Sequence, residues 1–279
     1  MIFPLFLLTL CLLVRAELTM TAASAACRLF VTAVLPGLFP YMVLSLMLTS
    51  RIRRLSPGLV MLLGWGGGSP TGARLLGLCP GFSRREQVRL AVSCATMSPM
   101  FLLGTVGMWL ASPAAGMVCL ASVIAGGWGA GRIASLWSGR VHNGRPHNDE
   151  GIIPPPPLSF GAAIDASART MLLVCGTMVM LRVLAALAAE VLPGMLILPV
   201  TTLLEVTTGA QQIAALSLPL PLRTALIAGA TGFGGMAILM QNRAVYPSGF
   251  LPLGAQLSWQ AVHGAFSFLL ALGTMTMLC

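Results

Sequence analysis

Long apolar stretches recur along this chain, and short arginine-containing segments separate them. A hydrocarbon core about 30 Å thick needs roughly 20 apolar residues for each helical crossing, so this pattern predicts membrane-spanning helices. Apolar residues make up 57% of the chain and charged residues 8%, whereas a soluble domain carries about 25% charged residues. A chain this apolar cannot cover a water-facing surface. The sequence therefore predicts an all-α polytopic membrane protein that contacts the lipid bilayer.

All 16 basic residues are arginine, and the formal net charge is +9. Without lysine the chain cannot build a Walker-A phosphate loop, a Schiff base or a pyridoxal phosphate anchor. The arginines flank apolar stretches, where the positive-inside rule places them, and we therefore expect no nucleic-acid partner. The seven cysteines form no CxxC pair, and the chain contains neither HExxH nor GxSxG. We expect no enzyme activity, no cofactor and no metal site.

A hydrophilic segment divides the chain nearly in half. It spans residues 138–161 and contains the proline run 154–157, a composition that predicts a stiff cytoplasmic linker. Before it we expect an N-terminal transmembrane span within residues 1–21 and a first repeat at residues 22–137. A second repeat is expected at residues 162–279.

The two halves share short strings in the same order. Each half begins with a long apolar helix, and a Thr-Gly-Ala string and then an Ala-Thr pair follow it, at 71–73 and 95–96 in the first half and at 208–210 and 230–231 in the second. Three membrane crossings lie between the start of the first long helix and the linker. An odd number of crossings makes the second repeat start from the opposite side of the membrane to the first. We therefore predict two inverted repeats, each with a re-entrant or broken helical segment, as in many secondary transporters.

The arginine clusters indicate which side of the membrane each segment faces. Residues 56–82 are apolar but interrupted by glycine and proline, and neither half is long enough to cross. If this segment enters and returns, the clusters at 51–54, 84–89 and 132–145 all lie on one side, which the positive-inside rule makes cytoplasmic. Residues 195–221 are expected to form the mirror image from the outer face.

The other apolar stretches predict spans, and in two of them helix-weakening residues follow the Ala-Thr pair, Ser98-Pro99 in the first half and Gly234-Gly235 in the second. Within them, Asp165 and Arg169 are one helical turn apart and are expected to pair. His263 is interpreted mainly as a packing residue. The expected spans are 22–49, 90–111, 114–131, 162–190, 222–241 and 256–278.

Inverted repeats with broken helices place a site near the midplane, where the interruptions meet. Glu205 stands out because an intramembrane carboxylate is costly and normally faces a cavity or a partner. We interpret it as a ligand for a substrate or cation, or as a proton-coupling group; the alternative is a structural hydrogen-bond anchor. No arginine is obviously placed to pair with it. The candidate binding residues are Glu205, Thr207, Thr208, Gly209, Gly68, Ser69, Pro70, Thr71, Gly72, Ser98 and Gln241.

Five strings carry a family resemblance: LPGLFPYMVLSLML at 35–48, GGSPTGARL at 67–75, SPMFLLGTVG at 98–107, LLEVTTG at 203–209 and FGGMAILMQ at 233–241. They resemble the YlbJ-type sporulation integral membrane proteins, which carry the nucleoside recognition or Gate domain. The resemblance implies a bacterial cell-membrane protein, in the mother-cell or forespore membrane, that is needed for endospore formation. It implies a carrier for a small solute, with a coupling cation, and leaves open a homo-oligomer or a complex with other spore-membrane proteins.

The chain departs from the family pattern at the candidate site. Gly68-Ser69-Pro70 stands where the family has Gly-Tyr-Pro, Ala95 and Thr96 replace an asparagine pair, and Ala237 and Ile238 replace small polar residues. The loss of amide side chains argues against recognition of a nucleoside base. A non-transporting membrane scaffold is therefore kept as the alternative function.

Overall fold

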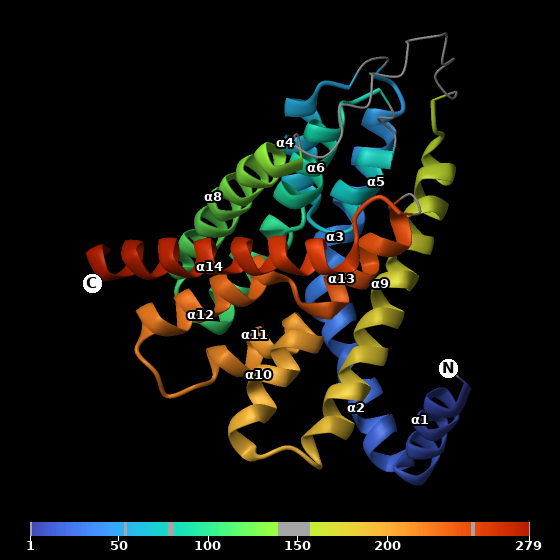
Figure 1. Cartoon of the computed structure of the whole chain (residues 1–279), viewed down its shortest axis with the longest axis vertical. Helices are drawn as coiled ribbons and strands as arrows, with labels where there is room; N and C mark the ends of the chain where they lie inside the picture. Colours follow the sequence, from blue (N-terminus) through green and yellow to red (C-terminus); the bar gives the residue numbers. More distant parts are fainter. Residues whose placement is uncertain (1, 53–54, 78–80, 139–156, 247–248, 279) are drawn as a thin grey trace.

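The computed structural model describes residues 2–52, 55–77, 81–138, 157–246 and 249–278 (Figure 1). Most of the predicted linker, residues 138–161, lies outside these ranges. The described residues form helices and turns without a strand, which confirms the all-α prediction. Within the described residues, five helices are long and apolar enough to cross a membrane, and the chain is a polytopic membrane protein. They are Ala16–Thr49, Pro113–Ser138, Phe160–Ala189, Leu220–Val245 and Leu253–Leu278.

The N-terminal helix α1 (Ile2–Val14) is shorter than the span expected there. Its 13 residues rise about 20 Å at 1.5 Å per residue, which is less than the roughly 30 Å of a hydrocarbon core. The chain leaves helical geometry at Arg15, whose guanidinium pairs with Glu190. The first long helix then begins at Ala16 rather than at residue 22.

This long helix contains a widened turn. It consists of α2 (Ala16–Leu29), a π-helical turn η1 (Phe30–Val34) and α3 (Leu35–Thr49). Pro36 lacks a backbone N–H and its ring crowds the preceding turn, which accounts for the π-helical turn just before it. The helix packs along α9 (Phe160–Ala189), the long helix of the second half.

Four further segments each consist of two helical arms separated by a short interruption. They are α4 (Pro57–Gly67) with α5 (Thr71–Gly77), α6 (Arg84–Ser93) with η2 (Phe101–Val106) and α7 (Gly107–Trp109), α10 (Gly194–Leu204) with α11 (Val206–Ala214), and α12 (Leu220–Phe233) with α13 (Gly235–Val245).

Two of these interruptions lie at the helix-weakening residues within the expected spans at 90–111 and 222–241, and the second of these spans is part of the apolar helix Leu220–Val245. Between α6 and η2 residues 94–98 are non-helical and the helix resumes at Pro99, because proline disfavours helical geometry in the residue before it but is tolerated in the first helical turn. Between α12 and α13, Gly234 and Gly235 adopt positive φ angles of 80° and 67°, which end a right-handed helix.

The order of elements is the same in the two halves (Figure 1). Each has a long helix, two interrupted pairs, and a final long helix, which is α8 (Pro113–Ser138) in the first half and α14 (Leu253–Leu278) in the second. The glycine of each Thr-Gly-Ala string lies where the two helices of its interrupted pair contact each other. A Cβ on Gly72 would lie 3.5 Å from the Gly64 Cα, and one on Gly209 would lie 2.6 Å from the Thr202 Cα. The duplication stays a prediction, and this matching order supports it.

Glycines on α8 allow other helices to pack closely. A Cβ on Gly127 would lie 3.0 Å from the His263 ring, and one on Gly131 would lie 2.7 Å from the Arg89 carbonyl. The helix α8 accordingly packs against both α6 and α14, as small residues allow in membrane proteins.

Candidate functional site

The two interruptions of the first half meet each other. The Ser69 backbone N–H donates to the Thr96 carbonyl at 2.7 Å. Gly68 has a φ of 62° and no room for a side chain, since a Cβ there would lie 2.6 Å from the Ser98 nitrogen. Backbone groups freed from one helix are therefore satisfied and covered by the next interruption, as lipid surroundings require.

The two interruptions of the second half meet in the same way. A Cβ on Gly235 would lie 3.0 Å from the Leu203 carbonyl oxygen and 3.5 Å from the Val206 nitrogen. These two residues flank Glu205, the single residue between α10 and α11. The glycine-rich interruption thus lies directly against the residue that the sequence marks as unusual.

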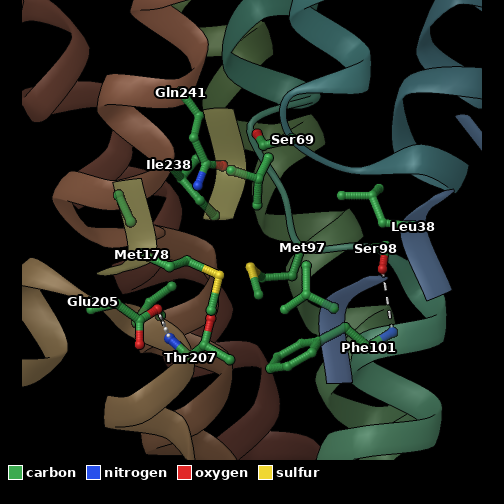
Figure 2. A pocket seen from close by; sticks show the side chains of 14 residues that line it. Leu38, Ser69, Met97, Ser98, Phe101, Met178, Glu205, Thr207, Ile238 and Gln241 are labelled. Atoms are coloured by element: carbon green, nitrogen blue, oxygen red, sulfur yellow. Dashed lines mark hydrogen bonds between the residues drawn. The ribbon is translucent and has the colours of Figure 1, made fainter. Parts of the chain in front are cut away.

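A cavity of about 30 Å³ lies between the halves, beside all four interruptions (Figure 2). One water needs at least about 10–15 Å³ of such volume, so the cavity has room for roughly two waters. Its polar lining residues are Ser69, Ser98, Glu205, Thr207 and Gln241. Its apolar lining residues are Val34, Leu38, Met97, Phe101, Val174, Met178, Val206, Ala237 and Ile238.

Glu205 is both a wall of this cavity and the N-cap of α11. Its side chain is buried, with the whole residue 1% exposed. One carboxylate oxygen accepts from the Thr207 N–H at 2.9 Å, and the other accepts from the Thr208 N–H at 2.7 Å. The partial positive charge of the helix N-terminus favours an anion at this position. The geometry thus satisfies the buried carboxylate with donors from its own helix.

No arginine of the described residues forms an ion pair with Glu205, as expected, but the sequence reasoning missed Arg182. It is half-buried on α9 and interacts electrostatically with the Glu205 carboxylate. The ion pairs within 4.0 Å in the described part of the chain are Arg15–Glu190 and Arg169–Asp165, so Arg182 acts on Glu205 from a longer distance. Arg182 lies within the expected span at 162–190, and a charged side chain inside a span is itself a signal for a functional group.

The eleven sequence candidates separate into two groups. Ser69, Ser98, Glu205, Thr207 and Gln241 line the cavity. Gly68, Pro70, Thr71, Gly72, Thr208 and Gly209 shape the interruptions without lining it.

Two of the polar lining residues are held by neighbours. Gln241 donates from Nε2 to Thr177 Oγ1 at 2.9 Å, which ties α13 to α9. Ser98 accepts from the Phe101 N–H at 3.3 Å at the start of η2. Figure 2 shows Gln241 and Ser69 at one end of the cavity and Glu205 with Thr207 at the other.

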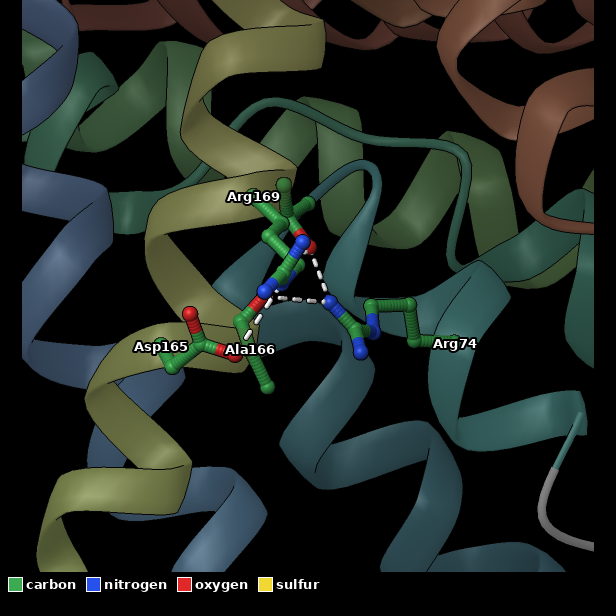
Figure 3. Close-up of polar contacts among 5 residues, drawn as sticks. Arg74, Asp165, Ala166 and Arg169 are labelled. Carbon is green, nitrogen blue, oxygen red and sulfur yellow. Dashed lines mark hydrogen bonds and ion pairs between the residues drawn. The ribbon is translucent and has the colours of Figure 1, made fainter.

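An arginine bridge joins α5 of the first half to α9 of the second (Figure 3). Arg74 on α5 donates to the Ala166 carbonyl at 2.8 Å and to Thr170 Oγ1, both on α9. Close by, Arg169 and Asp165 form the predicted ion pair, with N and O 3.0 Å apart. The first interrupted pair is therefore fixed to the long helix of the opposite half.

Comparisons with family models, with curated proteins and with solved structures find no match to this chain. The fold and the site define a class: a polytopic α-helical membrane protein with a small, partly polar cavity among its interrupted helices. The family resemblance of the sequence stays an expectation.

Proposed function

We propose that this protein is a carrier that moves a small polar solute or cation across the membrane through the cavity around Glu205. One observation carries the proposal: four helix interruptions from both halves converge on a cavity that has a buried carboxylate in its wall. Irregular backbone at membrane depth is tolerated where protein or a wet cavity surrounds it. Carriers built from repeats place their binding sites at such points.

The chemistry of the cavity suits a small cationic or hydroxyl-bearing ligand. The carboxylate of Glu205, the hydroxyls of Ser98 and Thr207 and the amide oxygen of Gln241 are oxygen ligands of the kind that hard cations prefer. The volume of about 30 Å³ fits an ion or a water-sized group. A larger solute requires the two halves to move apart, as they do in alternating access.

Reconstitution into vesicles tests the carrier directly. We would measure entry of four probes: protons with an internal pH dye, ²²Na⁺, radiolabelled glycine and radiolabelled uridine. The proposal predicts that at least one probe enters faster than in protein-free vesicles, with a rate that depends on pH or on a monovalent cation. Folded protein that admits none of the probes above the vesicle background overturns it.

We further propose that this transport serves endospore formation, in the mother-cell or forespore membrane of a bacterium. The support is the resemblance at residues 98–107 and 203–209 to sporulation membrane proteins. Deletion of the gene is expected to lower the count of heat-resistant spores without slowing vegetative growth. A deletion strain that sporulates normally contradicts this assignment and leaves the carrier to be judged by the flux measurement.

A membrane scaffold is the second candidate, and the hydrogen bonding of Glu205 is the observation that favours it. Both carboxylate oxygens already accept from α11 backbone N–H groups, so a purely structural role is chemically complete. A scaffold predicts no flux for any probe together with a partner protein that purifies with the chain in stoichiometric amount.

A further inference from the structure

A second polar chamber lies between α6 and α14. Gln256, Gln260 and His263 follow one another on the same face of α14, and they are 6%, 3% and 0% exposed. Within the described chain, Gln256 Oε1, both amide atoms of Gln260 and His263 Nδ1 have no hydrogen-bond partner. Buried polar atoms are nearly always hydrogen-bonded, to protein or to ordered water. This cluster therefore needs a ligand that the described residues do not supply.

His263 shows what such a ligand must offer. Its Nε2 lies 2.9 Å from the Val123 carbonyl oxygen, which only accepts, so Nε2 carries the proton. In the neutral ring Nδ1 is then a bare acceptor. The chamber around Gln260 and His263 measures about 10 Å³, close to the smallest volume that holds one water. A water both donates and accepts, as this mixed set of groups requires.

The C-terminal end of α13 carries residues that line the central cavity and a residue next to it that lines the chamber. Gln241 lines the central cavity, and Tyr246 lines the chamber. Between them lies Asn242, which is 1% exposed, and both polar atoms of its side chain lack a partner within the described chain. Tyr246 Oη donates to the Ala91 carbonyl at 3.4 Å, so the end of α13 lies against α6.

The end of α6 and the interruption after it likewise carry residues that line the chamber and residues that line the central cavity. Ser98 lines the central cavity, and Ala95 lines the chamber. Between them, the buried Thr96 Oγ1 has no partner among the residues that the structure describes, and the same is true of Ser69 Oγ, next to the Thr96 carbonyl. On both segments, buried polar groups without a partner in the described chain thus lie, in sequence order, between residues that line the two spaces.

We propose that these groups line a continuous hydrated path from the central cavity, past Thr96 and Asn242, to the chamber of Gln260 and His263, and that the path takes water. As the route by which the ligand of the carrier reaches one membrane face, it rests on the proposed function. The hydration itself does not, and it can be tested without any flux.

The test measures thiol accessibility in the full-length protein, reconstituted in vesicles with its native cysteines replaced. The probe is 2-aminoethyl methanethiosulfonate, a small cation. Gln260→Cys and Asn242→Cys are compared with Ala271→Cys, which lies on the same face of α14 but is 0% exposed in an apolar cluster. The path predicts that both test cysteines react at least tenfold faster than the control. If either one reacts at the control's rate, the path is overturned.

A second measurement needs no variant and guards against a substitution that fails to fold. A high-resolution structure of the wild-type protein should show ordered water within hydrogen-bond distance of Gln260 and Asn242. A dry chamber at that resolution overturns the proposal. Vesicles in which both cysteines label but no probe flows keep the hydrated path and overturn the carrier, whereas flux without labelling overturns only the path.

Discussion

The carboxylate of Glu205 faces the cavity and caps α11 at the same time. A carboxylate has about four lone-pair positions, and two of them accept the Thr207 and Thr208 N–H groups. The remaining positions leave room for a cation or a hydroxyl ligand. A binding role and a structural role are therefore compatible at this residue.

At the scale of single residues, Gly68→Ala should destabilise the protein strongly. The substitution forces a side chain into a backbone conformation that glycine adopts, with φ at 62° and ψ at −164°, and strain of this kind costs about 1–3 kcal/mol. The new Cβ would also press on the Ser98 nitrogen. The matched control is Gly58→Ala on the same helix, where nothing lies within 4 Å of the added Cβ.

Thermal unfolding in detergent measures both variants. We expect the midpoint to fall clearly for Gly68→Ala and to stay unchanged or rise slightly for Gly58→Ala, because alanine favours helix by about 1 kcal/mol over glycine. Equal midpoints for the two variants would show that the contact between the interruptions is not as tight as the structure has it.

The sequence indicated the polar part of the cavity but not the apolar part. Glu205 and Gln241 were identifiable because polar groups are rare in apolar stretches. Leu38, Met178 and the other apolar lining residues were not, because in a chain that is 57% apolar nothing local distinguishes a lining residue from a packing residue. The electrostatic interaction of Arg182 with Glu205 depends on how α9 packs, which no local pattern gives.

At the scale of helices, interruptions were predictable only where the sequence concentrates them. The glycine run before Pro70 and the polar string after Leu204 stand out against apolar neighbours. Gly234 and Gly235 were identifiable as a helix-weakening pair, but membrane helices also commonly use glycine for close packing. A glycine that lets two helices pack and a glycine that ends a helix look the same in the sequence. Only the positive φ angles of Gly234 and Gly235 show that they end a helix.

The bridge from α5 to α9 yields a prediction at this scale. Arg74→Met keeps the apolar stem of the side chain but removes the hydrogen bonds to Ala166 and Thr170. Hydrogen bonds of a charged donor contribute roughly 1–3 kcal/mol, so we expect a lower unfolding midpoint. Arg169→Met is the control, since its ion pair with Asp165 is exposed and exposed pairs contribute little. An equal effect of both substitutions would contradict a structural role for the bridge.

At the scale of the whole molecule, arginine placement predicts the topology. The first interrupted pair should enter from the cytoplasmic face and return to it, and α10 with α11 should do the same from the outer face. Impermeant thiol labelling checks this on a background without native cysteines. Arg51→Cys and Gly81→Cys should label from the cytoplasmic side, and Val191→Cys and Ser217→Cys from the outer side. Label reaching Arg51→Cys and Gly81→Cys from opposite faces would end the re-entrant arrangement.

The most direct test of the proposed carrier is the flux of Glu205→Gln protein in vesicles, with whichever of the four probes the wild type admits. Glutamine keeps one acceptor for the α11 backbone and loses the other, so a stability loss of only about 1 kcal/mol is expected. The control is Glu190→Gln, which removes the surface pair with Arg15 far from the cavity lining. We predict that Glu205→Gln lowers the flux at least tenfold and abolishes its dependence on pH or cation, while Glu190→Gln transports as the wild type does. A folded Glu205→Gln protein with wild-type flux and wild-type pH dependence would contradict the account.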